Sequence, residues 1–129
     1  MIGIVIVAHG GLSHEYLAAV EHVVGKQTGI LAVKIEPDHN RRKKEEEICD
    51  AANQVDNGNG VVIVTDMFGG SPSNLSMLAC KQENRKIIYG ANLPLLIKLA
   101  KCRKQKMEKA IETALDAGRK YINTHDGLN

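Results

Sequence analysis

Aromatic residues are scarce in this chain of 129 residues, which contains no Trp, one Phe and three Tyr. Few side chains are therefore available to stack on nucleic-acid bases, and a formal net charge of +2 is too small to indicate such a partner by itself. The basic run at residues 41–44 continues directly into three Glu residues, a pattern typical of a solvated helix face. We therefore expect no binding to nucleic acid.

Cysteine is equally sparse. Cys49, Cys80 and Cys102 are odd in number, widely spaced and free of any C-x-x-C pair, so they predict neither a disulfide framework nor a zinc site. The histidines give no metal pattern either, because His14 and His22 lie eight residues apart rather than at the i, i+4 spacing of a helical pair. We expect no resident metal and no cofactor.

Long apolar runs are also absent, since every such stretch is far shorter than the ~20 residues that a membrane span needs. The amino terminus lacks the basic region and cleavage site of a secretory signal. We therefore expect a cytoplasmic protein without direct membrane insertion. The length, with 43% hydrophobic and 25% charged residues, predicts a single globular domain over residues 1–129.

Short β-branched runs alternate with amphipathic segments along the chain. Strands are expected at residues 2–8, 30–35, 61–65 and near 86–89. Helices are expected between a Ser13 cap and Gly25, at 41–55, from Pro72 to about Cys80, at 95–101, and from Met107 to a stop at Gly118. This alternation predicts an α/β fold built from right-handed βαβ units. We expect a three-layer sandwich with a mostly parallel sheet of strand order 2-1-3-4 and helices on both faces.

Two residues that carry reactive groups follow buried strands. His9 ends the first run, in which six of the seven preceding residues are apolar, and Asp66 follows the third strand. In the order 2-1-3-4 these two residues face each other across the topological switch point, where open parallel sheets bind ligands. A carboxylate that accepts a hydrogen bond from one imidazole nitrogen leaves the other nitrogen free as a nucleophile. The alternative is that Asp66 caps a turn and His9 is an ordinary loop histidine.

The segment after Asp66 favours the reactive interpretation. Gly69 and Gly70 allow close approach of the backbone, Ser71 is a good helix N-cap, and Pro72 suits the first helical position. Free amides at that helix start, together with the Ser71 hydroxyl, would form a seat for a phosphoryl group. Taken by itself, this motif is equally explained by an ordinary capped helix. It therefore supports a phosphoryl site only in combination with His9.

Three segments, in order along nearly the whole chain, resemble the IIA domain of the mannose-family phosphoenolpyruvate:sugar phosphotransferase system (PTS). They are the strand ending at His9–Gly10, residues 66–74 (DMFGGSPSN) and residues 90–96 (GANLPLL). In that family the histidine after the first strand accepts a phosphoryl group from the phosphocarrier HPr and passes it to a IIB domain. The resemblance implies that His9 is this phosphohistidine, that Asp66 orients it, and that the protein is a phosphotransferase.

The resemblance also implies the remaining site residues. Gly10, Gly70 and Ser71 are expected to bind the phosphate. The pocket is expected to be lined by Met67, Phe68, Gly69, Asn92, Leu93 and Pro94. One departure is Gly11, where a larger residue often stands in the family.

The partners implied by the resemblance are phospho-HPr as donor and a IIB domain or protein as acceptor, with association to a membrane permease complex. No IIB segment follows in this sequence, so we expect the acceptor to be another polypeptide. The family fold further implies a homodimer that exchanges an antiparallel carboxy-terminal strand to the edge of the partner's sheet. Residues 121–124 are the candidate for that strand.

Other functions remain open at this point. Small tetrapyrrole chelatases also open with a strand running into Ala-His-Gly, but further histidines at strand ends would be expected, whereas this chain has Asp66 and Asn92 there. A response-regulator receiver would need an acidic pair where His9 stands. Within the PTS family, a phosphocarrier for a dihydroxyacetone kinase or a regulator without a transporter would share the same site, and the sugar is not determined.

Overall fold

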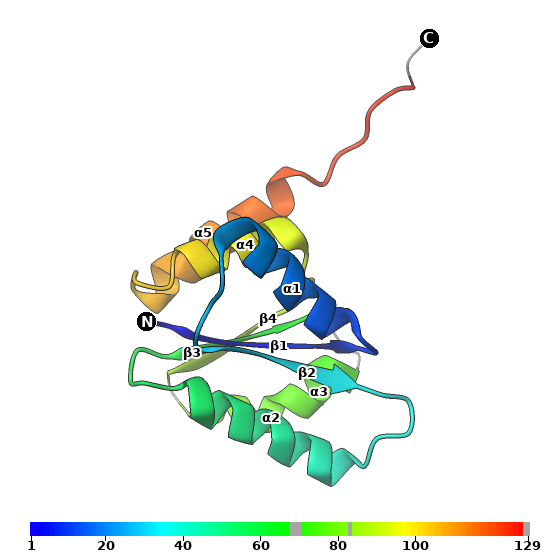
Figure 1. The fold of residues 1–129 in the computed structure, drawn as a ribbon, viewed down its shortest axis with the longest axis vertical. Coiled ribbons are helices and arrows are strands. Elements are labelled where there is room, and N and C mark those ends of the chain that lie inside the picture. The colour runs from blue at the N-terminus through cyan, green and yellow to red at the C-terminus, as the bar shows by residue number, and fades with distance from the viewer. Residues whose placement is uncertain (68–70, 83, 128–129) are drawn as a thin grey trace.

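The computed structural model describes residues 1–67, 71–82 and 84–127. Its four strands are β1 (Gly3–His9), β2 (Ile30–Ile35), β3 (Val61–Thr65) and β4 (Arg85–Ile88). They form one sheet in the order β2-β1-β3-β4, and all three pairings are parallel (Figure 1). The expected order 2-1-3-4 is therefore confirmed, and β1 and β3 are neighbours at the centre of the sheet.

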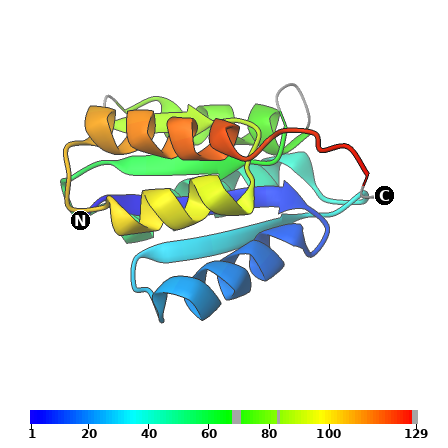
Figure 2. The same ribbon diagram turned by 90° about the horizontal axis from the view of Figure 1, so that it is seen from above.

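Helices cover both faces of the sheet and give three layers (Figures 1 and 2). One face carries α1 (Leu12–Val24), α4 (Leu93–Lys101) and α5 (Met107–Lys120). The other face carries α2 (Arg41–Val55) and α3 (Ser71–Ser76), the latter followed by a 3₁₀ turn at Met77–Cys80. The predicted α/β sandwich is thus confirmed.

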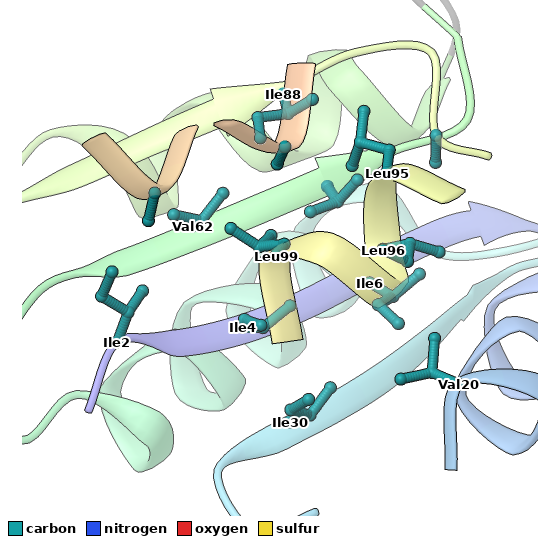
Figure 3. Packing of buried hydrophobic residues seen from close by; sticks show 14 of the residues in the cluster. Ile2, Ile4, Ile6, Val20, Ile30, Val62, Ile88, Leu95, Leu96 and Leu99 are labelled. Atoms are coloured by element: carbon teal, nitrogen blue, oxygen red, sulfur yellow. The ribbon is translucent and has the colours of Figure 1, made fainter. Parts of the chain in front are cut away.

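The core consists of two apolar clusters, one on each face, because successive side chains of a strand point to opposite sides. From β1, Ile4 and Ile6 pack toward α4 residues such as Leu99 (Figure 3), whereas Val5 and Val7 belong to the cluster under α2 and α3. Because β1 is covered on both faces, its sequence is an unbroken apolar run rather than an alternating one.

The start of α1 differs from the prediction. The helix begins at Leu12 with Gly11 as its N-cap residue, and no side chain caps it, so the expected Ser13 cap is wrong. Gly10 has a φ of 56°, which turns the chain immediately after β1 and starts the helix sooner. Ser13 consequently lies inside the helix and is fully buried. Gly25 ends α1 as predicted, with a φ of 89°.

The end of α5 also differs, because the helix passes through Gly118 and continues to Lys120. Gly118 is buried against α4, and a Cβ placed on it would lie 3.0 Å from Leu95 Cβ. The glycine therefore permits close helix packing rather than ending the helix. The last strand is shifted by one residue from the expected position, since Arg85 pairs with Val61.

The segment after α5 extends away from the three layers (Figure 1). Residues 121–127 are exposed, and Ile122 exposes 74% of its surface. In the single described chain residues 121–124 pair with no strand, and their exchange onto a second copy stays a prediction. Across the described ranges, no helix combines the length and apolarity that crossing a bilayer requires.

Candidate active site

His9 is the last residue of β1, at the carboxyl edge of the sheet. The next residue, Gly10, turns sharply, and its amide donates a hydrogen bond of 2.8 Å to the carbonyl of Ile35 at the end of β2. This bond closes the β1–α1 turn against the neighbouring strand. It also occupies the Gly10 N–H, which is therefore not free to bind a phosphate.

The side chain of Asp66 holds His9 in place. Its Oδ2 lies 2.8 Å from His9 Nδ1 and accepts a second hydrogen bond of 3.1 Å from the His9 backbone N–H. An ionised carboxylate has no proton to donate, so Nδ1 carries the hydrogen, and in the neutral imidazole the lone pair lies on Nε2. Within the described part of the chain Nε2 forms no hydrogen bond.

Exposure differs strongly between the two partners. The His9 side chain is 50% exposed and that of Asp66 only 12%. The second carboxylate oxygen, Asp66 Oδ1, is buried and has no hydrogen-bond partner among residues 1–67, 71–82 and 84–127. The pair therefore presents a reachable imidazole whose orientation is set from beneath by a largely buried charge.

The sheet brings the two residues together. In the register of β1 with β3, Val7 pairs with Thr65, so the chain segments leaving both strands are adjacent at the same edge. The Thr65 carbonyl accepts a hydrogen bond of 3.0 Å from the Ala91 amide, which also ties the turn after β4 to this edge. The predicted meeting of His9 and Asp66 at the switch point follows from this topology.

Tyr16 is a site neighbour that the sequence reasoning missed. Its hydroxyl donates a hydrogen bond of 3.2 Å to the Ala91 carbonyl, and its ring packs partly buried against the core. Burial raises the pKa of the Tyr16 phenol above its ordinary value of 10.0, and the negative charge of Asp66 raises it further. The sequence does contain a signal for its inward orientation, because Tyr16, Val20 and Val24 recur at a spacing of four residues and so share one face of α1.

The predicted turn residues after β4 make contacts within the fold. The Asn92 amide oxygen accepts a hydrogen bond from Leu95 N–H at the start of α4, and its nitrogen donates one of 2.8 Å to the Gly118 carbonyl. Leu93 packs on the core, and Pro94 lines a surface pocket between α4 and α5. The described contacts of these residues do not include His9 or Asp66.

The glycine-rich segment is described only in part. Met67 follows Asp66 directly and exposes 54% of its surface. Ser71 is exposed and is itself the first residue of α3 rather than the residue before it. The predicted site residues Phe68, Gly69 and Gly70 lie outside the described residues. His14 is exposed on α1, and its described hydrogen bond is with Ser13.

Comparison with known proteins gives the family. The family model for the PTS system fructose IIA component matches residues 3–115. YadI of Escherichia coli K12, provisionally named a phosphotransferase enzyme IIA component, is 32% identical over 104 residues, which are 80% of this chain and 71% of YadI. The chain therefore belongs to the PTS fructose and mannose IIA family, which is a phosphotransferase family of sugar uptake.

Longer and structural relatives agree with this assignment. The PTS mannose-specific EIIAB component of Escherichia coli K12 is 27% identical over 94% of this chain, which spans only 38% of that longer protein. The PTS IIA protein associated with the fucose utilization operon of Streptococcus pneumoniae is 25% identical, with a TM-score of 0.81 over 94% of this chain and 91% of its own. The mannose/sorbose-specific IIA subunit of Enterococcus faecalis, at 19% identity, shares the fold with a TM-score of 0.87 over 99% and 97% of the two chains.

Proposed function

We propose that His9 accepts a phosphoryl group from phospho-HPr and passes it to a IIB-type acceptor, so that the protein is a phosphocarrier with a phosphohistidine intermediate. The observation that carries this proposal is the contact of 2.8 Å between His9 Nδ1 and Asp66 Oδ2. In the neutral imidazole this contact leaves the lone pair on Nε2, in a half-exposed ring. A nucleophile with these properties suits a family whose members are phosphotransferase components.

The transfer needs no general base. The Nε2 lone pair of His9 attacks phosphorus in line as the bond from phosphorus to the donor breaks, and the donor leaves with that electron pair. The imidazole then develops positive charge, which the Asp66 carboxylate offsets through the Nδ1–H bond. Transfer to the acceptor reverses these steps with the acceptor as nucleophile. Catalysis therefore consists of positioning and electrostatics.

Protein partners have contact surface beside the histidine. Met67 follows Asp66, Leu12 begins α1 three residues after His9, and both expose large apolar side chains. Apolar side chains around a reactive group are suited to the centre of a protein interface. Because donor and acceptor must both reach the same nitrogen, we propose that they bind this face in turn.

Residues around the ring are assigned accordingly. We assign the exposed Ser71 hydroxyl to the phosphoryl group, together with Gly70. Gly10 contributes space, since a Cβ there would meet no atom within 4 Å. We assign Met67, Phe68 and Gly69 to the border of the pocket, whereas Asn92 holds the turn after β4 in position through its bonds to Leu95 and Gly118.

The broader assembly is also a proposal. We place the protein in the cytoplasm, in association with a membrane permease complex, as a homodimer that exchanges residues 121–124. The exposed tail and the position of β4 at one edge of the described sheet support the exchange. Removing residues 121–129 should convert the dimer to a monomer in analytical ultracentrifugation. A dimer that persists in the truncated chain would contradict strand exchange.

The phosphoacceptor role is tested by incubation with phosphoenolpyruvate, enzyme I and HPr. We expect a phosphate that is labile in acid, stable in alkali and lost in His9→Ala. His14→Ala is the matched control, because His14 is exposed on the neighbouring helix and should leave labelling unchanged. Label that persists in His9→Ala would contradict the proposal.

The acceptor is tested separately. Phosphorylated protein is mixed with a IIB protein or with a dihydroxyacetone kinase, and loss of phosphate is followed. We expect discharge to the IIB protein, whereas discharge only to the kinase would favour that alternative carrier role. Membership of the PTS IIA family disfavours the tetrapyrrole chelatase considered from the sequence.

A further inference from the structure

Two hydrogen bonds link Tyr16 to the end of β3. The Tyr16 hydroxyl donates to the Ala91 carbonyl at 3.2 Å, and the Ala91 amide donates to the Thr65 carbonyl at 3.0 Å. Thr65 directly precedes Asp66. The turn after β4 is therefore held on one side by α1, which starts three residues after His9, and on the other side by the strand that presents Asp66.

The residues that form this link are largely buried. Thr65 is fully buried, and its hydroxyl donates a hydrogen bond of 3.5 Å to the Ile88 carbonyl. Ala91 is 9% exposed, and the Tyr16 ring packs against the cluster that joins α1 to α4. Such a link transmits a shift of α1 to the end of β3 instead of absorbing it.

The His9–Asp66 contact depends on the same geometry. His9 lies at the beginning of the connection into α1, whereas Asp66 follows Thr65 at the end of β3, so the 2.8 Å contact joins the two segments that leave neighbouring strands. The Tyr16 phenol is protonated near neutral pH and able to donate, since its ordinary pKa of 10.0 is raised further by burial and then by the Asp66 charge. Tyr16 can thus fix the distance between these segments under working conditions.

We infer that Tyr16 is a positioning residue for phosphoryl transfer: its hydrogen bond to Ala91 holds α1 against the β3 and β4 ends, and this keeps Asp66 seated on Nδ1 of His9. The inference rests on the proposed function of His9. Tyr16 does not touch the phosphoryl group, and it acts on the nucleophile only through the position of Asp66.

The test is Tyr16→Phe, which keeps the packed ring and removes the hydroxyl. We expect phosphorylation by phospho-HPr to slow about fivefold, which corresponds to about 1 kcal/mol for one neutral hydrogen bond. Imidazole ¹⁵N NMR of the unphosphorylated protein should show a smaller fraction of the Nδ1–H tautomer at His9. In an Asp66→Asn background the substitution should change the rate by less than twofold, because Tyr16 acts through that carboxylate.

The matched control is Thr113→Val, which removes another hydroxyl-to-carbonyl hydrogen bond, on α5. It should change neither the rate nor the His9 tautomer. A wild-type rate in Tyr16→Phe, or a slower rate with an unchanged tautomer, would overturn the inference. If wild-type protein is not phosphorylated at all, the proposed function fails, and the tautomer spectra still decide whether Tyr16 positions Asp66.

Discussion

One oxygen of Asp66 accepts both hydrogen bonds that His9 offers to it. The backbone N–H of His9 lies 3.1 Å from Oδ2 and its ring Nδ1 lies 2.8 Å from the same atom. The carboxylate thereby fixes the imidazole relative to the histidine's own backbone, at the end of β1. Rotation of the ring would break the shorter contact while the longer one remains.

Replacing that carboxylate should slow the chemistry without unfolding the protein. We expect Asp66→Asn to be phosphorylated roughly 10- to 100-fold more slowly, because a hydrogen bond to a charged group contributes about 1.5–3 kcal/mol. The melting temperature should change by only a few degrees, since the His9 side chain is half exposed. Rapid-quench kinetics with phospho-HPr measure the rate. Wild-type kinetics in Asp66→Asn would show that the carboxylate does not orient the nucleophile.

Asn92 should affect stability rather than transfer. Its side chain caps α4 at Leu95 and bonds to the Gly118 carbonyl on α5. We expect Asn92→Ala to lower the free energy of unfolding by about 2 kcal/mol, from one lost cap and one lost hydrogen bond. Asn92→Ser, which retains a capping oxygen but loses the bond to Gly118, should lose about half of that. Urea denaturation distinguishes them, and equal stabilities for all three proteins would contradict this role.

A partly buried polar cluster at the start of β4 should make stability depend on acid pH. The Gly58 amide donates to Asp56 Oδ1 at 2.9 Å, and Arg85 Nη2 lies 3.2 Å from Oδ2. The Gly58 bond, followed by those from Arg85 and Asn84, lowers the pKa of Asp56 below its ordinary value of 3.8, although burial opposes the shift.

Because the folded pKa is the lower one, the stabilisation is present above the unfolded value and is lost as pH falls through the folded value. Asp56→Asn should therefore lower stability at pH 7, and its difference from wild type should shrink as the pH falls below about 4. Chemical denaturation at pH 7, 5 and 3 measures this difference. A difference in free energy of unfolding that stays constant across the three pH values would show that ionisation of Asp56 does not contribute to stability.

Much of this architecture follows from local sequence patterns. The unbroken apolar runs that become β1 and β3 predict central strands covered on both faces, and the adjacency of these two strands brings His9 near Asp66. The bounds expected for residues 30–35, 41–55 and 61–65 agree with β2, α2 and β3. These elements are bounded by glycine, proline and asparagine, whose backbone preferences operate locally.

The remaining features depend on contacts between elements distant in sequence. Glycine is the residue type that often ends a helix, yet Gly118 lies within α5, where the absence of a side chain allows Leu95 to approach closely. Ser13 has the residue type of a cap, but Gly10 turns the chain earlier. Tyr16 contacts Ala91, which is 75 residues away in sequence. Locally, only the helix face that Tyr16 shares with Val20 indicates that its side chain points toward the core. Local propensity cannot anticipate such tertiary contacts.

The most direct test of the central claim is to identify the phosphorylated atom. Protein labelled with ¹⁵N-histidine is phosphorylated through HPr, and ³¹P and ¹⁵N NMR report which ring nitrogen bears phosphorus. Because Asp66 engages Nδ1, we predict one phosphohistidine, at Nε2 of His9. Phosphate on Nδ1 of His9, on another histidine or on a carboxylate would contradict the account.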